Sequence, residues 1–222
     1  MATPQPINAP TYLRLREKIR EDIVAGVWAL GSHITLAELG NHYQVSNVPV
    51  REALLQLQGE GVIEMRMNRG AVIPGVDAKY IEDTYQLRGA LQSMLARLAC
   101  ERATEAQLKT LDAVAGAYED AVASGEVAAC VAANRHFHNH LELLADNAGA
   151  VELLQARSSL VDAFRRARGY APGRLDKVSA QHRKIVRAIV RRDADAASQA
   201  VLAHTDASRL DLLDLLKRSP HV

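Results

Sequence analysis

The sequence predicts a mainly α-helical protein in two parts, a winged helix-turn-helix followed by an all-helical bundle. Aromatic residues make up only 4% of the 222 residues, while alanine and leucine are abundant, and this composition favours helices. Up to about residue 76, three short helical patterns precede two short alternating segments, which is the element order of a winged helix-turn-helix. Beyond Asp77 every pattern is helical.

Composition and charge exclude several classes of protein but identify no partner. The chain carries 27 basic and 26 acidic residues, for a net charge of +1. Residues 1–76 are also balanced, with seven of each sign, so any contact with nucleic acid must be argued from where the charges lie. The sequence has no run of 18 apolar residues and no secretory pattern at its start, and its two cysteines suggest no disulfide framework. We therefore expect a cytoplasmic protein without membrane contact.

The predicted DNA-binding part covers residues 10–76 and follows a flexible arm at residues 1–9, where prolines are frequent. Its first helix begins near Tyr12. Four apolar residues at four-residue spacing are predicted to share the inner face of this helix: Leu15, Ile19, Ile23 and Val27.

Two further helices are predicted to form the helix-turn-helix. Thr35 is suited to cap the second helix, in which Leu36 and Leu39 point inward. A tight turn at Gln44-Val45 leads to the third helix, which follows Ser46 as its cap. The inner face of that helix carries Val50, Leu54 and Leu57.

Two alternating segments, residues 62–65 and 71–73, are predicted to form a hairpin. Asn68-Arg69-Gly70 between them is a suitable turn. Pro74-Gly75 then marks the boundary of a second domain, residues 77–222. Six helices are predicted in it: roughly 78–102, 104–124, 126–146, 149–168, 175–191 and 193–217.

The third helix has the residues of a DNA-reading element. Its start can meet a phosphate with free N–H groups, and Arg51, one turn in, can pair with the O6 and N7 atoms of guanine. Arg69 can enter the minor groove or bind a phosphate, while Gly70 permits close approach of the backbone. The alternative, equally compatible with the spacing, is that both arginines are ordinary surface charges.

These residues resemble the GntR family of bacterial regulators. The stretch VSNVPVREALLQLQGEGVIE from Val45, the later NRGAVI, and IREDIVAGVWALGSHI from Ile19 all match the family pattern. The resemblance implies an operator-binding homodimer whose DNA contacts include Ser46, Asn47, Arg51, Arg69 and Gly70. Two positions depart from the family: Asn47 stands where arginine is usual, and Ala37 where a basic residue is frequent. A different half-site is the expected consequence, since asparagine can read adenine or bind phosphate.

Eight histidines are present, three of them between Asn134 and His140. Residues two apart on a helix point in nearly opposite directions, so His136, His138 and His140 cannot bind one ion together. Residues four apart can. The spacing allows Asn134 with His138, or His136 with His140, and does not choose between them.

The second half resembles the C-terminal ligand-binding domain of FadR-type GntR proteins, known as the FCD domain, in its shorter six-helix, VanR-like variant. The matching patterns are N-x-x-F-H from Asn134, H-x-x-I-V-x-A-I-x-x-x-D from His182, and a histidine on the closing helix. By position, the resemblance implies a divalent metal bound by Asn134, His138, His182 and His204. Asparagine replaces the more usual aspartate. Zinc, nickel, iron or manganese suits such a donor set.

Arg88 matches an arginine of the family and could bind a carboxylate with two parallel hydrogen bonds. The alternative is an ion pair with Glu82 or Asp83. The resemblance implies a repressor that a small carboxylate releases from DNA, and a second domain that binds this effector and the metal and dimerises. Two alternatives are a metal-responsive regulator without organic effector and a helical metalloenzyme, although no H-E-x-x-H motif supplies a general base.

Overall fold

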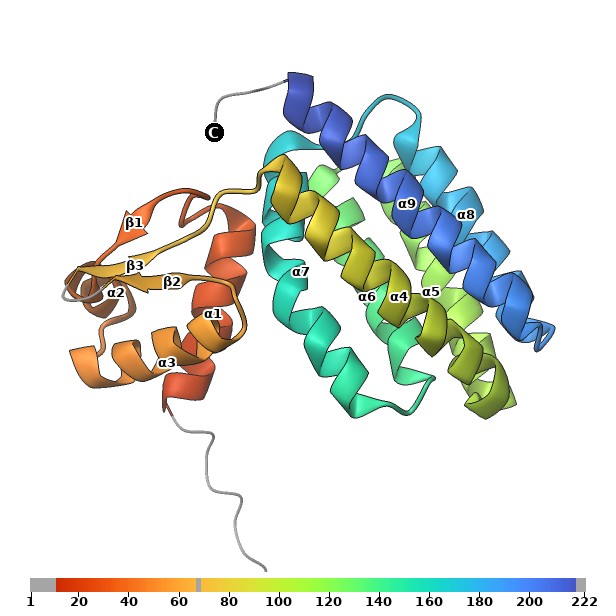
Figure 1. Cartoon of the computed structure of the whole chain (residues 1–222), viewed down its shortest axis with the longest axis horizontal. Coiled ribbons are helices and arrows are strands. Elements are labelled where there is room, and N and C mark those ends of the chain that lie inside the picture. The colour runs from red at the N-terminus through yellow and green to blue at the C-terminus, as the bar shows by residue number, and fades with distance from the viewer. Residues whose placement is uncertain (1–10, 67–68, 219–222) are drawn as a thin grey trace, which may run out of the picture. The chain divides into compact units, whose positions relative to one another are not determined.

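The computed structural model describes residues 11–66 and 69–218, and the chain divides into two compact units, Met1–Gly75 and Val76–Val222 (Figure 1). The predicted class is confirmed: the first unit combines helices with a small sheet, and the described part of the second is helical throughout its regular elements. The predicted arm at residues 1–9 lies outside the described residues.

Helix α1 (Thr11–Ala25) contributes Leu15, Ile19 and Ile23 to the core of the first unit, as predicted. The prediction for Val27 is wrong, because its side chain is 52% exposed. The helix ends at Ala25, and Gly26 has a φ of 81°, which turns the chain away before Val27 can join the apolar face.

Helix α2 (Leu36–Tyr43) begins with a capping box. The hydroxyl of Thr35 accepts a hydrogen bond from the amide of Glu38, whose carboxylate accepts one from the amide of Thr35. Gln44, in the left-handed conformation, makes the turn that the sequence predicts. Leu36 is only partly buried, whereas Leu39 is fully buried.

Helix α3 (Asn47–Gly59) starts where predicted and buries Val50, Leu54 and Leu57 completely. Ser46 occupies the N-cap position, but its side chain makes no capping hydrogen bond. The start of α3 is therefore set by packing of its apolar face and by Pro49 in its first turn, not by a serine cap.

Three short strands form an antiparallel sheet in the order β1-β3-β2: β1 (His33–Ile34), β2 (Glu64–Arg66) and β3 (Gly70–Val72). The β2–β3 hairpin was predicted, but Met67 and Asn68 of its turn lie outside the described residues. Strand β1 was not predicted, because two residues are too few for a readable alternation. It pairs His33 with Val72 and Ile34 with Ala71.

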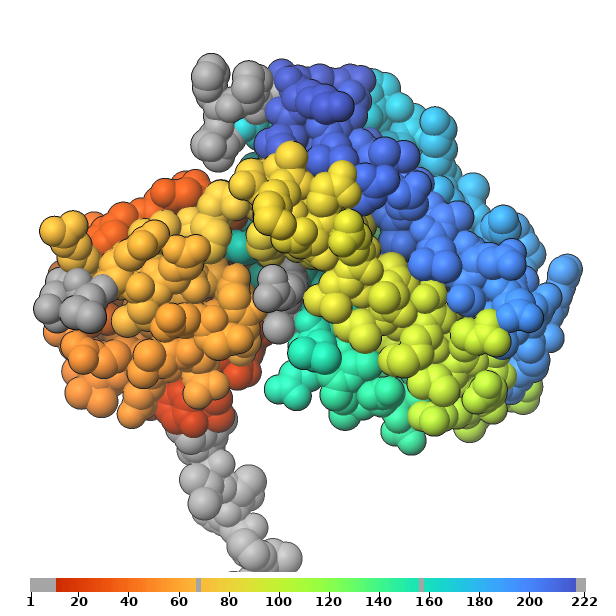
Figure 2. Space-filling view, viewed as in Figure 1, coloured from red at the N-terminus to blue at the C-terminus, as the bar shows by residue number. Residues whose placement is uncertain are grey.

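Asp77 caps the first helix of the second unit by accepting a hydrogen bond from the amide of Tyr80. The described helices of this unit are α4 (Ala78–Arg102), α5 (Glu105–Ser124), α6 (Val127–Leu143), α7 (Ala148–Arg168), α8 (Arg174–Val190) and α9 (Ala194–Arg218). Their bounds lie within a few residues of the predicted ones. Helices α4 and α9 pack together and form adjoining strips of one surface (Figures 1 and 2).

The core of this unit places the histidine-bearing helices around one point. Buried apolar residues of α4, α5, α6, α8 and α9 form one cluster, which includes Phe137 beside His138 and Ile185 beside His182. Cys100 and Cys130 are buried free thiols. Helices far apart in sequence thereby bring polar side chains to a shared interior site.

Candidate functional sites

The first unit carries an open groove of about 650 Å³ at the start of α2, along α3 and beside the hairpin. The described lining residues include three arginines and no acidic residue: Thr35, Leu36, Ala37, Asn47, Arg51, Leu55, Met65, Arg66, Arg69 and Gly70. A groove walled by cations and polar groups attracts a polyanion such as a nucleic-acid backbone.

Arg51 and Arg69 are exposed, and neither forms an ion pair with any residue in the described ranges. In contrast, Arg20 of α1 is bound to Glu60, away from the groove-lining residues. The net charge of this unit is balanced, but its charged side chains are therefore unevenly distributed. Arg51 and Arg69 carry unpaired charges at the groove, whereas the third groove arginine, Arg66, pairs with Glu64.

The structure shows an internal role for Gly70, beside which the predicted close approach to DNA stays a prediction. Its φ is 93°, and a Cβ atom at this position would lie 2.2 Å from the carbonyl oxygen of Ile34. Gly70 therefore allows β3 to pass against β1. Ser46 is exposed and is not among the groove-lining residues, while Asn47 lies in the groove on the first turn of α3.

Sequence reasoning missed Arg66 and the apolar part of the groove. Arg66 lies on β2 and donates a hydrogen bond to Glu64, two residues earlier on the same strand. Leu55 is 53% exposed on α3, one turn beyond Arg51. The sequence signal for this part of the groove was a leucine that does not fit the apolar period of its helix.

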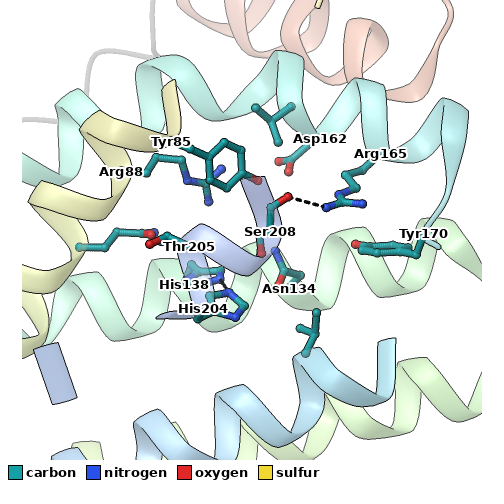
Figure 3. A pocket seen from close by; sticks show the side chains of 13 residues that line it. Tyr85, Arg88, Asn134, His138, Asp162, Arg165, Tyr170, His204, Thr205 and Ser208 are labelled. Atoms are coloured by element: carbon teal, nitrogen blue, oxygen red, sulfur yellow. Dashed lines mark hydrogen bonds between the residues drawn. The ribbon is translucent and has the colours of Figure 1, made fainter. Parts of the chain in front are cut away.

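The second unit contains a buried cluster of three histidines. His138 of α6, His182 of α8 and His204 of α9 are 5%, 1% and 3% exposed, and each offers a ring nitrogen within 4.8 Å of the others. Figure 3 shows His138 and His204 side by side, with Asn134 next to them. The structure thus brings together side chains from three different helices, the outer two 66 positions apart in the sequence.

The hydrogen bonding of this cluster is incomplete. The Nε2 atoms of His138 and His204 lie 3.2 Å apart, while neither ring nitrogen of His182 has a hydrogen-bond partner among the described residues. The ring of His182 stacks on Phe137 with centroids 3.9 Å apart. Buried nitrogens without partners are costly, and a metal ion would satisfy them. The donor set fits a divalent transition metal.

Burial holds these rings neutral, which is the form that binds metals. Desolvation, with a smaller contribution from Arg88, lowers the pKa of His138 to about 3. Desolvation, reinforced by neighbouring histidines and arginines, also lowers the pKa values of His182 and His204 well below the ordinary value. Each ring therefore has one lone pair available at neutral pH.

The two spacings left open by the sequence are now distinguished. Asn134 and His138 both line the cavity beside the cluster, whereas His136 is exposed on the other side of α6. His140 is half-buried and does not line this cavity. The pair four residues apart that faces the interior site is Asn134 with His138.

This cavity has a volume of about 30 Å³, enough for one or two water molecules. Its walls are mainly polar. The lining residues are Tyr85, Arg88, Gln92, Asn134, His138, Val161, Asp162, Arg165, Tyr170, Val178, His204, Thr205 and Ser208. Figure 3 shows that these side chains come from several helices and converge on the space above the histidines.

Arg88 lies in the cavity wall with a buried Nε that has no hydrogen-bond partner among the described residues. The alternative that it pairs with Glu82 or Asp83 is wrong. Arg209 binds Glu82 at 2.8 Å, and Lys79 binds Asp83 at 2.7 Å. Arg88 instead lies over the ring of Tyr85, 5.2 Å from its centroid.

Two ion pairs hold acidic or basic side chains of the cavity wall, Asp162 and Arg165, and were not predicted. Asp162 accepts a hydrogen bond of 2.6 Å from the Nε of Arg135, and Arg165 pairs with Asp211. Burial raises the pKa of Asp162, and Arg135 opposes that effect. Because these pairs join different helices, spacing along the chain gave no signal for them.

Fold and sites define a class of protein: a DNA-binding winged helix-turn-helix joined to a helical domain with an interior polar site. A family model described as bacterial regulatory proteins, gntR family, matches residues 11–73, and one described as FCD domain matches residues 83–207. The chain belongs to the gntR family of bacterial regulatory proteins and carries an FCD domain. It is a transcriptional regulator, and the metalloenzyme alternative has no support.

Curated relatives extend over nearly the whole chain. The Nta operon transcriptional regulator of Aminobacter aminovorans is 30% identical over 191 residues, covering 84% of this chain and 87% of the relative. The HTH-type transcriptional regulator YdhC of Bacillus subtilis is 26% identical over 88% of each chain. The HTH-type transcriptional repressor RspR of Escherichia coli is 27% identical over 90% of this chain and 86% of its own.

A solved structure supports the fold. The chain described as E. coli McbR/YncC has a TM-score of 0.82 at 17% identity, covering 93% of this chain and 98% of that one. Among the described helices, none has the length and apolar character needed to cross a bilayer.

Proposed function

We propose that this regulator is a repressor that binds operator DNA as a homodimer and is released by a small carboxylate bound near a divalent metal. The observation that carries the proposal is the presence, in one chain, of a groove with two unpaired arginines and a buried cluster of three histidines beside a polar cavity. The word repressor in the name of RspR, and in that of a probable D-xylose utilization operon repressor, supports the direction of regulation.

Three side chains of the groove are proposed to contact DNA directly. Arg51 binds a guanine edge in the major groove, Asn47 reads adenine or binds phosphate, and Arg69 binds the minor groove or a phosphate. Ser46 and Gly70 remain predicted contacts through the backbone at the same surface. Each half of a dimer would engage one half-site, so the separation of the two α3 helices determines affinity.

In the second unit, Asn134, His138, His182 and His204 are proposed to hold zinc, nickel, iron or manganese. The metal would act as a Lewis acid that binds an oxygen of the effector. Arg88, whose Nε has no partner among the described residues, would bind the carboxylate. Occupancy of the cavity would then change the population of dimer conformations that fit the operator.

A second candidate function is favoured by one observation. The cavity of about 30 Å³ is far smaller than ordinary ligand pockets, which are on the order of 300 Å³ or more. A regulator that responds to the metal alone, with water completing the coordination, would need no larger space. Titration of metal-loaded protein with small carboxylates separates the two functions.

DNA binding is tested with fragments that the purified protein selects from a random-sequence pool. Arg51→Ala should weaken binding by roughly 5- to 150-fold, corresponding to about 1–3 kcal/mol for a bidentate base contact. Arg14→Ala is the matched control, because Arg14 is an exposed arginine of the same unit that does not line the groove. Equal affinities of the two variants would contradict the role of Arg51.

Effector binding is tested by calorimetry of the zinc-loaded protein with a panel of small carboxylates. Any binding should be lost in Arg88→Met, while zinc affinity stays unchanged. Light scattering gives the oligomeric state. A monomer that binds a single half-site, or an Arg88→Met variant that still binds the carboxylate, would overturn the corresponding part of the proposal.

A further inference from the structure

Gln181, which precedes the histidine of α8, contacts the histidine of α9. Its Oε1 lies 3.0 Å from Nδ1 of His204, and the same oxygen lies 3.0 Å from Nη1 of Arg174. Arg174 begins α8 and is 6% exposed. One amide oxygen is therefore shared by a guanidinium and an imidazole inside the bundle.

The guanidinium determines which way the amide of Gln181 points. Arginine can only donate hydrogen bonds, so the amide atom that faces Arg174 must be the oxygen. The second Nη of Arg174 donates to the hydroxyl of Ser208 at 2.8 Å, which fixes the guanidinium in turn. The orientation of Gln181 is therefore set by its neighbours.

The tautomer of His204 follows from this orientation. Because the oxygen of Gln181 can only accept, Nδ1 of His204 must carry the proton. In a neutral ring the other nitrogen, Nε2, then has its lone pair free, and this is the atom that faces His138. A metal can bind only that form of the ring through Nε2.

We infer that Arg174 and Gln181 are positioning residues that hold His204 in the tautomer that presents Nε2 to a metal. The inference rests on the proposed metal site, but the tautomer itself can be tested without metal. Ser208 lines the cavity, so the same chain of hydrogen bonds joins the cavity wall to a metal-binding atom.

The metal-free test is nitrogen-15 NMR of the histidine rings in the full chain. The expected result is a protonated Nδ1 and an unprotonated Nε2 for His204. The signals of this ring are assigned by their absence from the spectrum of His204→Gln. The opposite tautomer would overturn the inference. This measurement holds even if the wild-type chain binds no metal, an outcome that would contradict only the proposed metal site.

The metal test measures Zn²⁺ affinity by competition with a chromophoric chelator. Gln181→Met, which keeps length but loses the acceptor, should bind Zn²⁺ about 10- to 100-fold more weakly. Gln181→Glu keeps an acceptor and should bind at least as tightly as wild type. Gln86→Met, an exposed glutamine on α4, is the control and should be unchanged.

A merely structural role is excluded by the visible absorption of bound Co²⁺. The visible absorption band of bound Co²⁺ should differ from wild type in Gln181→Met and should have its wild-type intensity in Gln181→Glu. If Gln181→Met does not fold, Arg174→Met gives the same comparison by releasing the amide, and weaker Zn²⁺ binding is again expected. Zn²⁺ affinity within twofold of wild type in the folded variant would overturn the inference.

Discussion

The Nε2 atoms of His138 and His204 face each other at 3.2 Å, although 66 positions separate the two residues in the chain. Two bare lone pairs at this distance repel, so in the metal-free protein one nitrogen must carry the proton between them. Both lone pairs become available to a cation only when that proton moves away. The two Nε2 atoms can therefore share a hydrogen bond or, once that proton has moved away, bind one cation together.

Replacing His182 should have opposite effects on stability and on metal binding. His182→Leu removes two buried nitrogens without partners, so the metal-free variant should be more stable than wild type by about 1 kcal/mol. Zn²⁺ at 100 times its Kd should stabilise wild type by about 2.7 kcal/mol and the variant not at all. Denaturant unfolding with and without Zn²⁺ measures both effects. A variant that Zn²⁺ still stabilises would show that His182 is not a ligand.

Asn134→Asp should tighten metal binding, because it adds a negative charge beside three neutral rings. We expect at least about a tenfold increase in Zn²⁺ affinity, a change that corresponds to 1.4 kcal/mol. Asn139→Asp is the matched control. It adds the same charge to the same helix at a position that does not line the cavity. Equal gains in the two variants would indicate a general charge effect instead of coordination.

Gly70→Ala should destabilise the first unit, because the new Cβ would collide with the carbonyl of Ile34 and the positive φ disfavours alanine. We expect a loss of about 2 kcal/mol or more in its free energy of unfolding. Trp28, the single tryptophan of the chain, reports unfolding of this unit by fluorescence. Gly59→Ala is the control, since a Cβ there meets no atom within 4 Å. A wild-type midpoint for Gly70→Ala would refute the close approach.

Glu142 should make stability depend on pH. Burial raises its pKa above the ordinary value, and the hydrogen bond from Gln92 only partly opposes this. A carboxyl with a raised pKa in the folded state contributes stability at low pH that is lost as the pH rises through that value. Glu142→Gln should therefore match wild type in acid and exceed its stability at neutral pH.

The measurement is the free energy of urea unfolding at several pH values. Glu152→Gln, on the exposed surface of α7, serves as the control and should follow wild type throughout. A constant difference between Glu142→Gln and wild type across the pH range would contradict an ionisation effect.

Local signals in the sequence predicted most of the fold. The cap at Thr35 and the start of α3 depend on neighbouring residues, and these predictions match the structure. Strand β1 and the exposure of Val27 were missed. Strand β1 depends on pairing with a strand that is distant in the sequence. The exposure of Val27 depends on the turn at Gly26, which ends the helical period before Val27.

The candidate sites were less predictable from the sequence than the fold. Spacing placed Asn134 and His138 on one face, but only the packing of α6, α8 and α9 shows which histidines meet. Asp162, Arg165 and Gln181 act through partners on other helices, and one sequence contains no sign of those pairings.

The small sheet of the first unit has a consequence for how operator preference can evolve. Strand β1 ends directly before Thr35, and β3 is held against it by backbone pairing and by Gly70. The strand pairing of the hairpin thus uses main-chain atoms, and no side-chain hydrogen bond or ion pair of Asn47, Arg51 or Arg69 is found among the described residues. If these side chains contact DNA as proposed, substitutions at them would change the DNA sequence that is bound while the sheet keeps its shape.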